Sequence, residues 1–154
     1  MIFATVGTQL PFDRLVGALD QQAGQSSEEF IIQTGPSRLK LEYATGFKQL
    51  DPERFERFVE GARLLVAHAG IGSLLTASAY GKPLIIVPRR KSLGEHRNEH
   101  QLATARQFQQ RIGVHIAWQV SDLGPLLIAK DLMPLEQTGA KHLQPLLDRI
   151  RTFI

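Results

Sequence analysis

The strongest constraint on the fold is a series of short apolar segments that alternate with segments of helical pattern. Three apolar segments occupy residues 2–6, 64–67 and 84–87, and helical patterns follow them at residues 11–22, 73–80 and 95–110. Strands that are apolar along their whole length are typical of parallel sheets covered by helices on both faces. The sequence therefore predicts an α/β domain with a doubly wound parallel sheet.

The other segments extend this pattern. Further strands are expected at residues 30–33, 39–43 and 114–118, and further helices at residues 52–61, 122–129 and 141–153. A chain of 154 residues suits one domain with a hydrophobic core, so we expect residues 1–154 to form a single domain. Ligands of such sheets bind at the carboxyl ends of the strands, which directs attention to the loops after Val6, Ala67 and Val87.

Composition restricts the function and the location. The chain contains no cysteine, which excludes a disulfide framework and a thiol nucleophile. The first residues lack the basic and long apolar segments of a signal peptide, and no apolar run approaches the roughly 20 residues of a membrane helix. We therefore expect a cytoplasmic protein whose membrane contact is peripheral.

Basic residues are concentrated in one part of the chain, although the formal net charge is only +3. Between Lys82 and Arg111 they outnumber Glu95 and Glu99. Such a segment suits a phosphorylated ligand, a nucleic acid or an acidic membrane surface, and a solvated basic face is the plain alternative. Aromatic residues are not interleaved with the basic ones, so a nucleic-acid partner is not expected.

The loop after the first expected strand reads Gly7-Thr8-Gln9. Glycine permits close backbone approach, and the N-terminus of the following helix directs free N–H groups towards an anion. The hydroxyl of Thr8 adds another donor. The loop therefore indicates a phosphate contact, with a plain tight turn as the alternative.

A second loop, His68-Ala69-Gly70-Ile71-Gly72-Ser73, lies between an apolar strand and a helix. Its two glycines fall where a phosphate needs room, and Ser73 can either cap the helix or bind phosphate. His68 can donate to a phosphate oxygen, and a structural histidine is the alternative role. The spacing matches neither the dinucleotide-binding Gly-x-Gly-x-x-Gly pattern nor a P-loop.

A third polar group occupies residues 95–101, where Glu95, His96, Glu99, His100 and Gln101 are close in sequence. On one continuous helix His96 and His100 would share a face. The order His96-x-x-Glu99-His100 matches an inverted zinc-protease motif, which makes a zinc hydrolase a distant alternative. The other interpretation is that these polar groups hydrogen-bond the sugar hydroxyls of a ligand held by the second loop.

Several short motifs in this order resemble the carboxyl-terminal domain of family 28 glycosyltransferases. They are Val6-Gly7-Thr8, Phe12-Asp13-Arg14-Leu15, the His68 to Ser73 loop, the segment from Gly81 to Arg89, and His100-Gln101. The chain looks most like the small subunit of a split, two-subunit bacterial polysaccharide glycosyltransferase. The resemblance implies a single Rossmann-like half of a GT-B glycosyltransferase, which binds a UDP-sugar and needs no metal or other cofactor.

The resemblance also implies roles for individual residues. Those expected to bind the donor are Gly7, Thr8, Gln9, Phe47, Lys48, His68, Gly70, Gly72, Ser73, Thr76, Arg89, Glu95, His100 and Gln101. Gly7 and the second loop would contact the diphosphate, and His100 and Gln101 the donor sugar. Phe47 and Lys48 would lie near the uracil. Thr76 replaces the acidic residue with which many relatives hold the ribose, so its hydroxyl would make a weaker contact than a carboxylate.

The function implied is that of a donor-binding subunit of an inverting transferase. The general base and the acceptor domain would come from a membrane-anchored partner, and the acceptor would be a lipid-diphosphate-linked sugar in exopolysaccharide or capsule assembly. Through this partner the chain would be peripheral to the inner membrane. Residues 140–154 form a candidate partner-docking helix, since apolar residues recur there at helical spacing. The alternative is a non-catalytic nucleotide-sugar-binding or scaffolding subunit, and the transferred sugar (glucuronate, glucose, galactose or GlcNAc) stays open.

Overall fold

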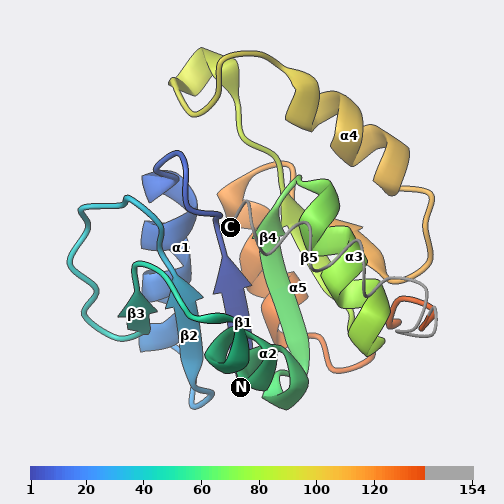
Figure 1. The fold of residues 1–154 in the computed structure, drawn as a ribbon, viewed down its shortest axis with the longest axis horizontal. Helices are drawn as coiled ribbons and strands as arrows, with labels where there is room; N and C mark the ends of the chain where they lie inside the picture. The colour runs from blue at the N-terminus through green and yellow to red at the C-terminus, as the bar shows by residue number, and fades with distance from the viewer. Residues whose placement is uncertain (138–154) are drawn as a thin grey trace.

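The computed structural model describes residues 1–137 and contains one six-stranded sheet (Figure 1). The strand order is β3-β2-β1-β4-β5-β6, and every neighbouring pair is parallel. The strands are β1 (Ile2–Thr5), β2 (Phe30–Gln33), β3 (Thr45–Phe47), β4 (Leu64–His68), β5 (Leu84–Val87) and β6 (Val114–Ile116). This order confirms the predicted doubly wound parallel sheet.

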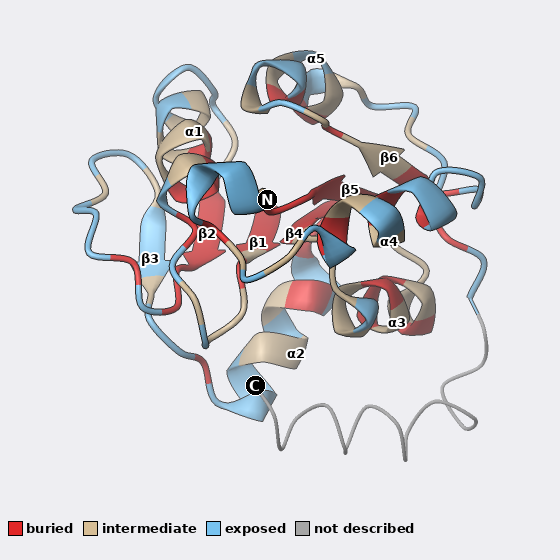
Figure 2. Ribbon diagram, turned by 90° about the horizontal axis from the view of Figure 1, so that it is seen from above, coloured by how far each residue is buried: buried red, intermediate tan, exposed pale blue. Residues whose placement is uncertain are grey.

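Helices cover both faces of the sheet (Figure 2). On one face lie α1 (Asp13–Gly24) and α5 (Leu123–Ile128). On the other face lie α2 (Pro52–Gly61), α3 (Ile71–Tyr80) and α4 (His100–Phe108). Two short 3₁₀ helices, η1 (Lys91–Leu93) and η2 (Val120–Asp122), lie in the connections after β5 and β6. Among the described residues, no helix combines the length and the apolar character that crossing a membrane requires.

Alternate residues of the central strands divide the core into two clusters. Ile2 and Ala4 pack with α1 and α5, whereas Phe3 packs with α2 and α3. Residues Leu65 and Val66 of β4 divide in the same way. Burial of each such aliphatic or aromatic side chain contributes about 1.5–3 kcal/mol, which explains why the strands carry apolar residues in succession.

The order of the strands reverses beside β1, and this determines where a ligand site can form. The chain leaves β1 through α1 to reach β2 on one side, while β4 pairs with the other side of β1. The loops after β1 and β4 therefore lead away to opposite faces and leave a crevice between them. Val6 and Gly7 follow β1 at this edge, and His68 ends β4.

The strand predicted at residues 39–43 is wrong, because the third strand is instead β3 at Thr45–Phe47. The Asp20 carboxylate on α1 accepts hydrogen bonds from the backbone N–H groups of Glu42, Tyr43 and Ala44 at 2.8–2.9 Å. These N–H groups are therefore directed towards α1, and pairing with β2 begins only at Thr45.

The helix predicted at residues 95–110 is also wrong at its start, since α4 begins at His100. Gly94 has φ +71°, and the Glu95 carboxylate accepts the backbone N–H of Arg90, so the chain turns before the helix. The Asn98 side chain accepts the backbone N–H of His100 at 3.0 Å, where the helix starts. His96 and His100 therefore do not share a helix face, which removes the geometric basis of the zinc-protease interpretation.

The helix predicted at residues 141–153 and the docking segment at residues 140–154 lie outside the described residues.

Candidate functional site

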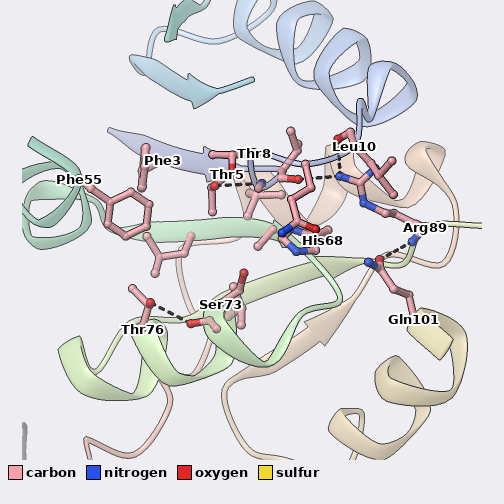
Figure 3. Close-up of a pocket in the computed structure, with 18 of the residues that line it drawn as sticks. Phe3, Thr5, Thr8, Leu10, Phe55, His68, Ser73, Thr76, Arg89 and Gln101 are labelled. Carbon is pink, nitrogen blue, oxygen red and sulfur yellow. Dashed lines mark hydrogen bonds between the residues drawn. The ribbon is translucent and has the colours of Figure 1, made fainter. Parts of the chain in front are cut away.

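A cavity of about 270 Å³ opens at the carboxyl edge of the sheet, where the β1 and β4 loops separate. Figure 3 shows Arg89 and Gln101 at one end, Phe3 and Phe55 at the other, and His68 between them. The polar lining residues are Thr5, Thr8, Gln9, His68, Ser73, Thr76, Arg89, His96 and Gln101. The cavity thus has a polar end near the strand termini and an apolar end between α2 and α3.

The ring of His68 lies against two glycines. A Cβ atom on Gly70 would lie 2.8 Å from Nε2 of His68, and one on Gly7 would lie 3.3 Å from its Cε1. Gly7 also has φ +76°, a conformation that glycine adopts without strain. Both positions therefore need glycine to make room for the imidazole, a reason that differs from the space for phosphate expected from the sequence.

Burial of the His68 ring, together with the positive charge of Arg89, lowers its pKa from 6.5 to about 4. The Thr5 backbone opposes this decrease but does not outweigh it, since Nδ1 is buried and makes no hydrogen bond of good geometry within residues 1–137. His68 is therefore neutral at pH 7 and offers one donor and one acceptor.

The N-terminus of α3 supplies main-chain donors to the cavity. This helix begins two residues earlier than expected, so Ser73 lies within its first turn and is not the N-cap; the N-cap is Gly70, which has no capping side chain. Gly72 and Ser73 line the cavity. Unsatisfied N–H groups and the positive end of the helix dipole make such a terminus favourable for an anion.

Thr76 lies one turn further along α3 and is 8% exposed. Its hydroxyl donates to the backbone oxygen of Gly72 at 2.9 Å, and the side chain lines the cavity. Because the hydroxyl proton is used within the helix, the oxygen can only accept a hydrogen bond from a ligand in this arrangement.

Arg89 is buried at the polar end and is 3% exposed. Its guanidinium donates to the backbone oxygens of Val6, Leu10, Pro11 and Glu95. Burial lowers the pKa of Arg89 to about 10, so the group keeps its charge at neutral pH. The polar end of the cavity therefore contains a fixed positive charge.

On α4, Gln101 lines the cavity and His100 does not. Oε1 of Gln101 accepts the backbone N–H of Arg89 at 2.9 Å, which fixes the orientation of the amide. His100 is exposed, whereas His96, which precedes the helix, lines the cavity. Of the two histidines, the structure thus brings His96 to the cavity and leaves the predicted His100 outside it.

Four other candidates are absent from the cavity lining: Gly70, which lies beside the His68 ring, and Phe47, Lys48 and Glu95. The Phe47 ring stacks on Phe58 with centroids 5.8 Å apart, and Lys48 is exposed. The carboxylate of Glu95 forms a bidentate pair with Arg14 at 2.8 and 2.9 Å. Glu95 thus supports the loop after β5, and the sugar contact predicted for it has no geometric support here.

Some lining residues were not anticipated from the sequence. Phe3, Phe55, Val59, Leu65 and Leu84 form the apolar end of the cavity. Apolar residues in a strand or on a helix face look alike in sequence whether they fill a core or line a cavity. The sequence therefore holds no signal that separates these residues from the rest of the core.

Comparison with known proteins places this chain among glycosyltransferases. The model of the family described as "Glycosyltransferase family 28 C-terminal domain" matches residues 1–123. The UDP-N-acetylglucosamine transferase subunit ALG13 of Homo sapiens is 31% identical over 123 residues, which are 71% of this chain and 10% of that protein. The same subunit of Mus musculus is 30% identical. The chain thus spans about a tenth of the length of these curated relatives.

Solved structures share the fold. The NMR solution structure of ALG13 matches with a TM-score of 0.61 and 18% identity, covering 99% of this chain and 96% of that one. The crystal structure of MurG from Acinetobacter baumannii matches with a TM-score of 0.61 and 15% identity, covering 96% of this chain and 49% of MurG. The chain therefore belongs to the glycosyltransferase family 28 C-terminal domain family, with the fold of a single Rossmann-like half of a GT-B glycosyltransferase.

Proposed function

We propose that the chain is the donor-binding subunit of an inverting glycosyltransferase that uses a UDP-sugar. The observation that carries this proposal is the polar end of the cavity, where the N-terminus of α3, the Gly7–Thr8 loop and the charge of Arg89 converge. All three favour an anion. A diphosphate fits this end, and the family and the similarity to a UDP-N-acetylglucosamine transferase subunit support a UDP-sugar as its source.

The same groups would assist the reaction itself. As the bond between the sugar and UDP breaks, negative charge grows on the departing diphosphate. Donors of α3 and the fixed charge of Arg89 are already oriented before the reaction, so they stabilise this charge without reorganisation. Gln101 and His96 at the same end of the cavity would contact the sugar.

The acceptor side is proposed to come from a partner. A membrane-anchored subunit would supply the acceptor domain and the general base, and a lipid-diphosphate-linked sugar would be the acceptor in exopolysaccharide or capsule assembly. This chain would then work on the cytoplasmic side, peripheral to the inner membrane. Its similarity to a transferase subunit, and its match to about half of MurG, support a division of the enzyme between two chains.

A transfer assay tests the proposal and separates it from a scaffolding role. The chain is co-expressed with the product of its neighbouring gene, and UDP-glucose, UDP-galactose, UDP-GlcNAc and UDP-glucuronate are each offered with a lipid-linked acceptor.

Gln101→Glu keeps an acceptor for the N–H of Arg89 but removes the amide donor, so transfer should fall about 100-fold while the complex stays intact. Gln107→Glu, at an exposed position of the same helix, is the control. Undiminished transfer by the Gln101 variant would contradict the proposed sugar contact, and no transfer by the wild-type complex with any donor would favour the scaffolding role.

A further inference from the structure

Arg89 makes an unusual set of contacts for a buried arginine, because its guanidinium donates four hydrogen bonds to main-chain oxygens. Nη2 donates to Val6 O at 2.6 Å and Leu10 O at 2.9 Å. Nη1 donates to Pro11 O at 2.7 Å and Glu95 O at 3.3 Å. Each terminal nitrogen of a guanidinium carries two hydrogens, so these four bonds use every terminal N–H of the side chain.

Three of the four acceptors belong to one loop. Val6, Leu10 and Pro11 enclose the segment that carries Gly7 and Thr8, and they lie 78 to 83 residues from Arg89 in the sequence. In a trans peptide the C=O group and the following N–H point in opposite directions. A carbonyl of Val6 directed at Arg89 therefore turns the N–H of Gly7 away from it, and that N–H donates to the Thr5 hydroxyl.

Arg89 also reaches the other side of the cavity. Its own backbone N–H donates to Oε1 of Gln101 on α4. Its guanidinium donates to the backbone oxygen of Glu95, which lies in the loop that precedes α4. The guanidinium carbon lies 4.7 Å from the centroid of the Phe12 ring, which covers it at the start of α1. One residue thus joins the loop after β1 to the loop and helix after β5, and residues of all three segments line the polar end of the cavity.

We propose that Arg89 is a positioning residue, which holds the Gly7–Thr8 loop and Gln101 in their binding geometry and does not itself bind the phosphates. A phosphate oxygen could accept a terminal N–H of Arg89 only after one of the four carbonyl bonds had broken. The inference rests on the proposed function for the identity of the ligand. The hydrogen bonds between Arg89 and the loop after β1, however, are present in the unliganded chain. The sequence suggested a direct contact with the donor, and the geometry assigns the residue a different role.

Hydrogen exchange and UDP affinity, measured on Arg89→Lys, test this role. Lysine keeps the charge but cannot make four bonds in a planar fork. Backbone amides of residues 7–10 and of Phe12 should exchange faster in the unliganded variant, and the Kd for UDP should rise by about tenfold or more. Arg90→Lys is the matched control, because Arg90 donates to Trp118 O and is not among the cavity-lining residues. It should change neither quantity.

The outcomes separate the two proposals. A raised Kd with unchanged loop exchange would overturn positioning and favour direct contact. Faster exchange with an unchanged Kd would overturn positioning alone, and failure of the wild-type chain to bind UDP would overturn the proposed function. A measurement without a variant covers the case in which Arg89→Lys does not fold. The guanidinium N–H signals of Arg89 in the wild-type NMR spectrum should stay protected when UDP is added, and loss of that protection would contradict the inference.

Discussion

At the scale of single residues, the site is organised around His68. Its ring occupies the space that Gly7 and Gly70 leave free, and its low pKa keeps it neutral beside the charge of Arg89. A neutral ring adds a directional donor without adding a second buried charge. The pairing of one buried cation with one neutral histidine explains how the cavity can favour an anion without strong repulsion between its own groups.

Gly70→Ala tests the contact between this glycine and His68. The backbone of Gly70 has φ −112° and ψ 146°, which alanine adopts without strain, so the added methyl acts mainly on the imidazole. We expect UDP affinity to fall about tenfold, with a loss of folding stability of about 1 kcal/mol. Calorimetric titration and a thermal melt measure the two effects. The control is Gly17→Ala, where the new Cβ makes ordinary contact with Leu39 at 3.5 Å, and equal affinity in the wild type and Gly70→Ala would contradict this account.

The low pKa of His68 also predicts a dependence of stability on pH. Between pH 6.5 and about 4 the unfolded chain binds a proton at this residue and the folded chain does not, so folding stability falls as the pH decreases through this range. The contribution should be about 1–3 kcal/mol. Urea denaturation at pH 7, 5.5 and 4 should show a shallower decrease for His68→Asn than for the wild type. Parallel curves for the two proteins would show that the pKa of His68 is not lowered by folding.

At the scale of elements, the connection from β5 to α4 is held by a partly buried ion pair. Glu95 is 9% exposed in this pair and accepts the N–H of Arg90 as well as two bonds from Arg14. Arg14 also donates to Pro88 O, so α1 is joined to the end of β5. This arrangement supports the approach to α4 and with it the position of Gln101.

Glu95→Gln removes the charge from this pair and leaves Arg14 without its carboxylate. Breaking a buried ion pair by changing one partner costs about 3–5 kcal/mol, and we expect about 2–4 kcal/mol because Arg14 is 22% exposed. Glu99→Gln, at an exposed position of the same connection, should change stability by less than about 0.5 kcal/mol. Denaturant unfolding of both variants gives the comparison, and equal midpoints would show that the pair does not hold the connection.

Most helices and strands could be predicted from the sequence, because runs of apolar residues and the helical spacing of apolar residues are visible within short segments of the chain. The strands β1, β4 and β5, and the loops at Gly7 and His68, follow directly from this pattern. The prediction failed where a distant side chain decides the local backbone, as Asp20 does for residues 42–44 and as Arg14 and Glu95 do before α4. The positioning role of Arg89 has the same origin, since its acceptors lie about 80 residues earlier in the chain.

At the scale of the whole molecule, the described part of the chain forms both core clusters from residues between Ile2 and Leu135. The match to about half of MurG indicates that the chain has the fold of one of the two GT-B halves. Under the proposed function the acceptor site comes from the partner, so the isolated, monodisperse chain should not transfer sugar to a lipid-linked acceptor. Robust transfer by the chain alone would overturn the split-enzyme proposal.

Deletion of residues 143–154 tests whether this segment, which lies outside the described residues, serves to bind the partner. Because residues 1–137 already supply buried residues to both clusters, the truncated chain should stay folded and bind UDP. We expect it to lose capture of the partner in a pull-down. Normal capture would refute the docking role, and unfolding in a thermal melt would assign the segment to the core.

The central claim is that a nucleoside diphosphate binds between the loops after β1 and β4, and titration of the wild-type chain with UDP tests it most directly. In an amide NMR spectrum, UDP should shift Gly7, Thr8, Gly72 and Ser73 most strongly, with uridine binding more weakly because it lacks the phosphates. Gly72→Val should stay folded and lose this response, because the added side chain fills the first turn of α3 beside the cavity. Absence of UDP binding, or shifts confined to residues remote from both loops, would contradict the account.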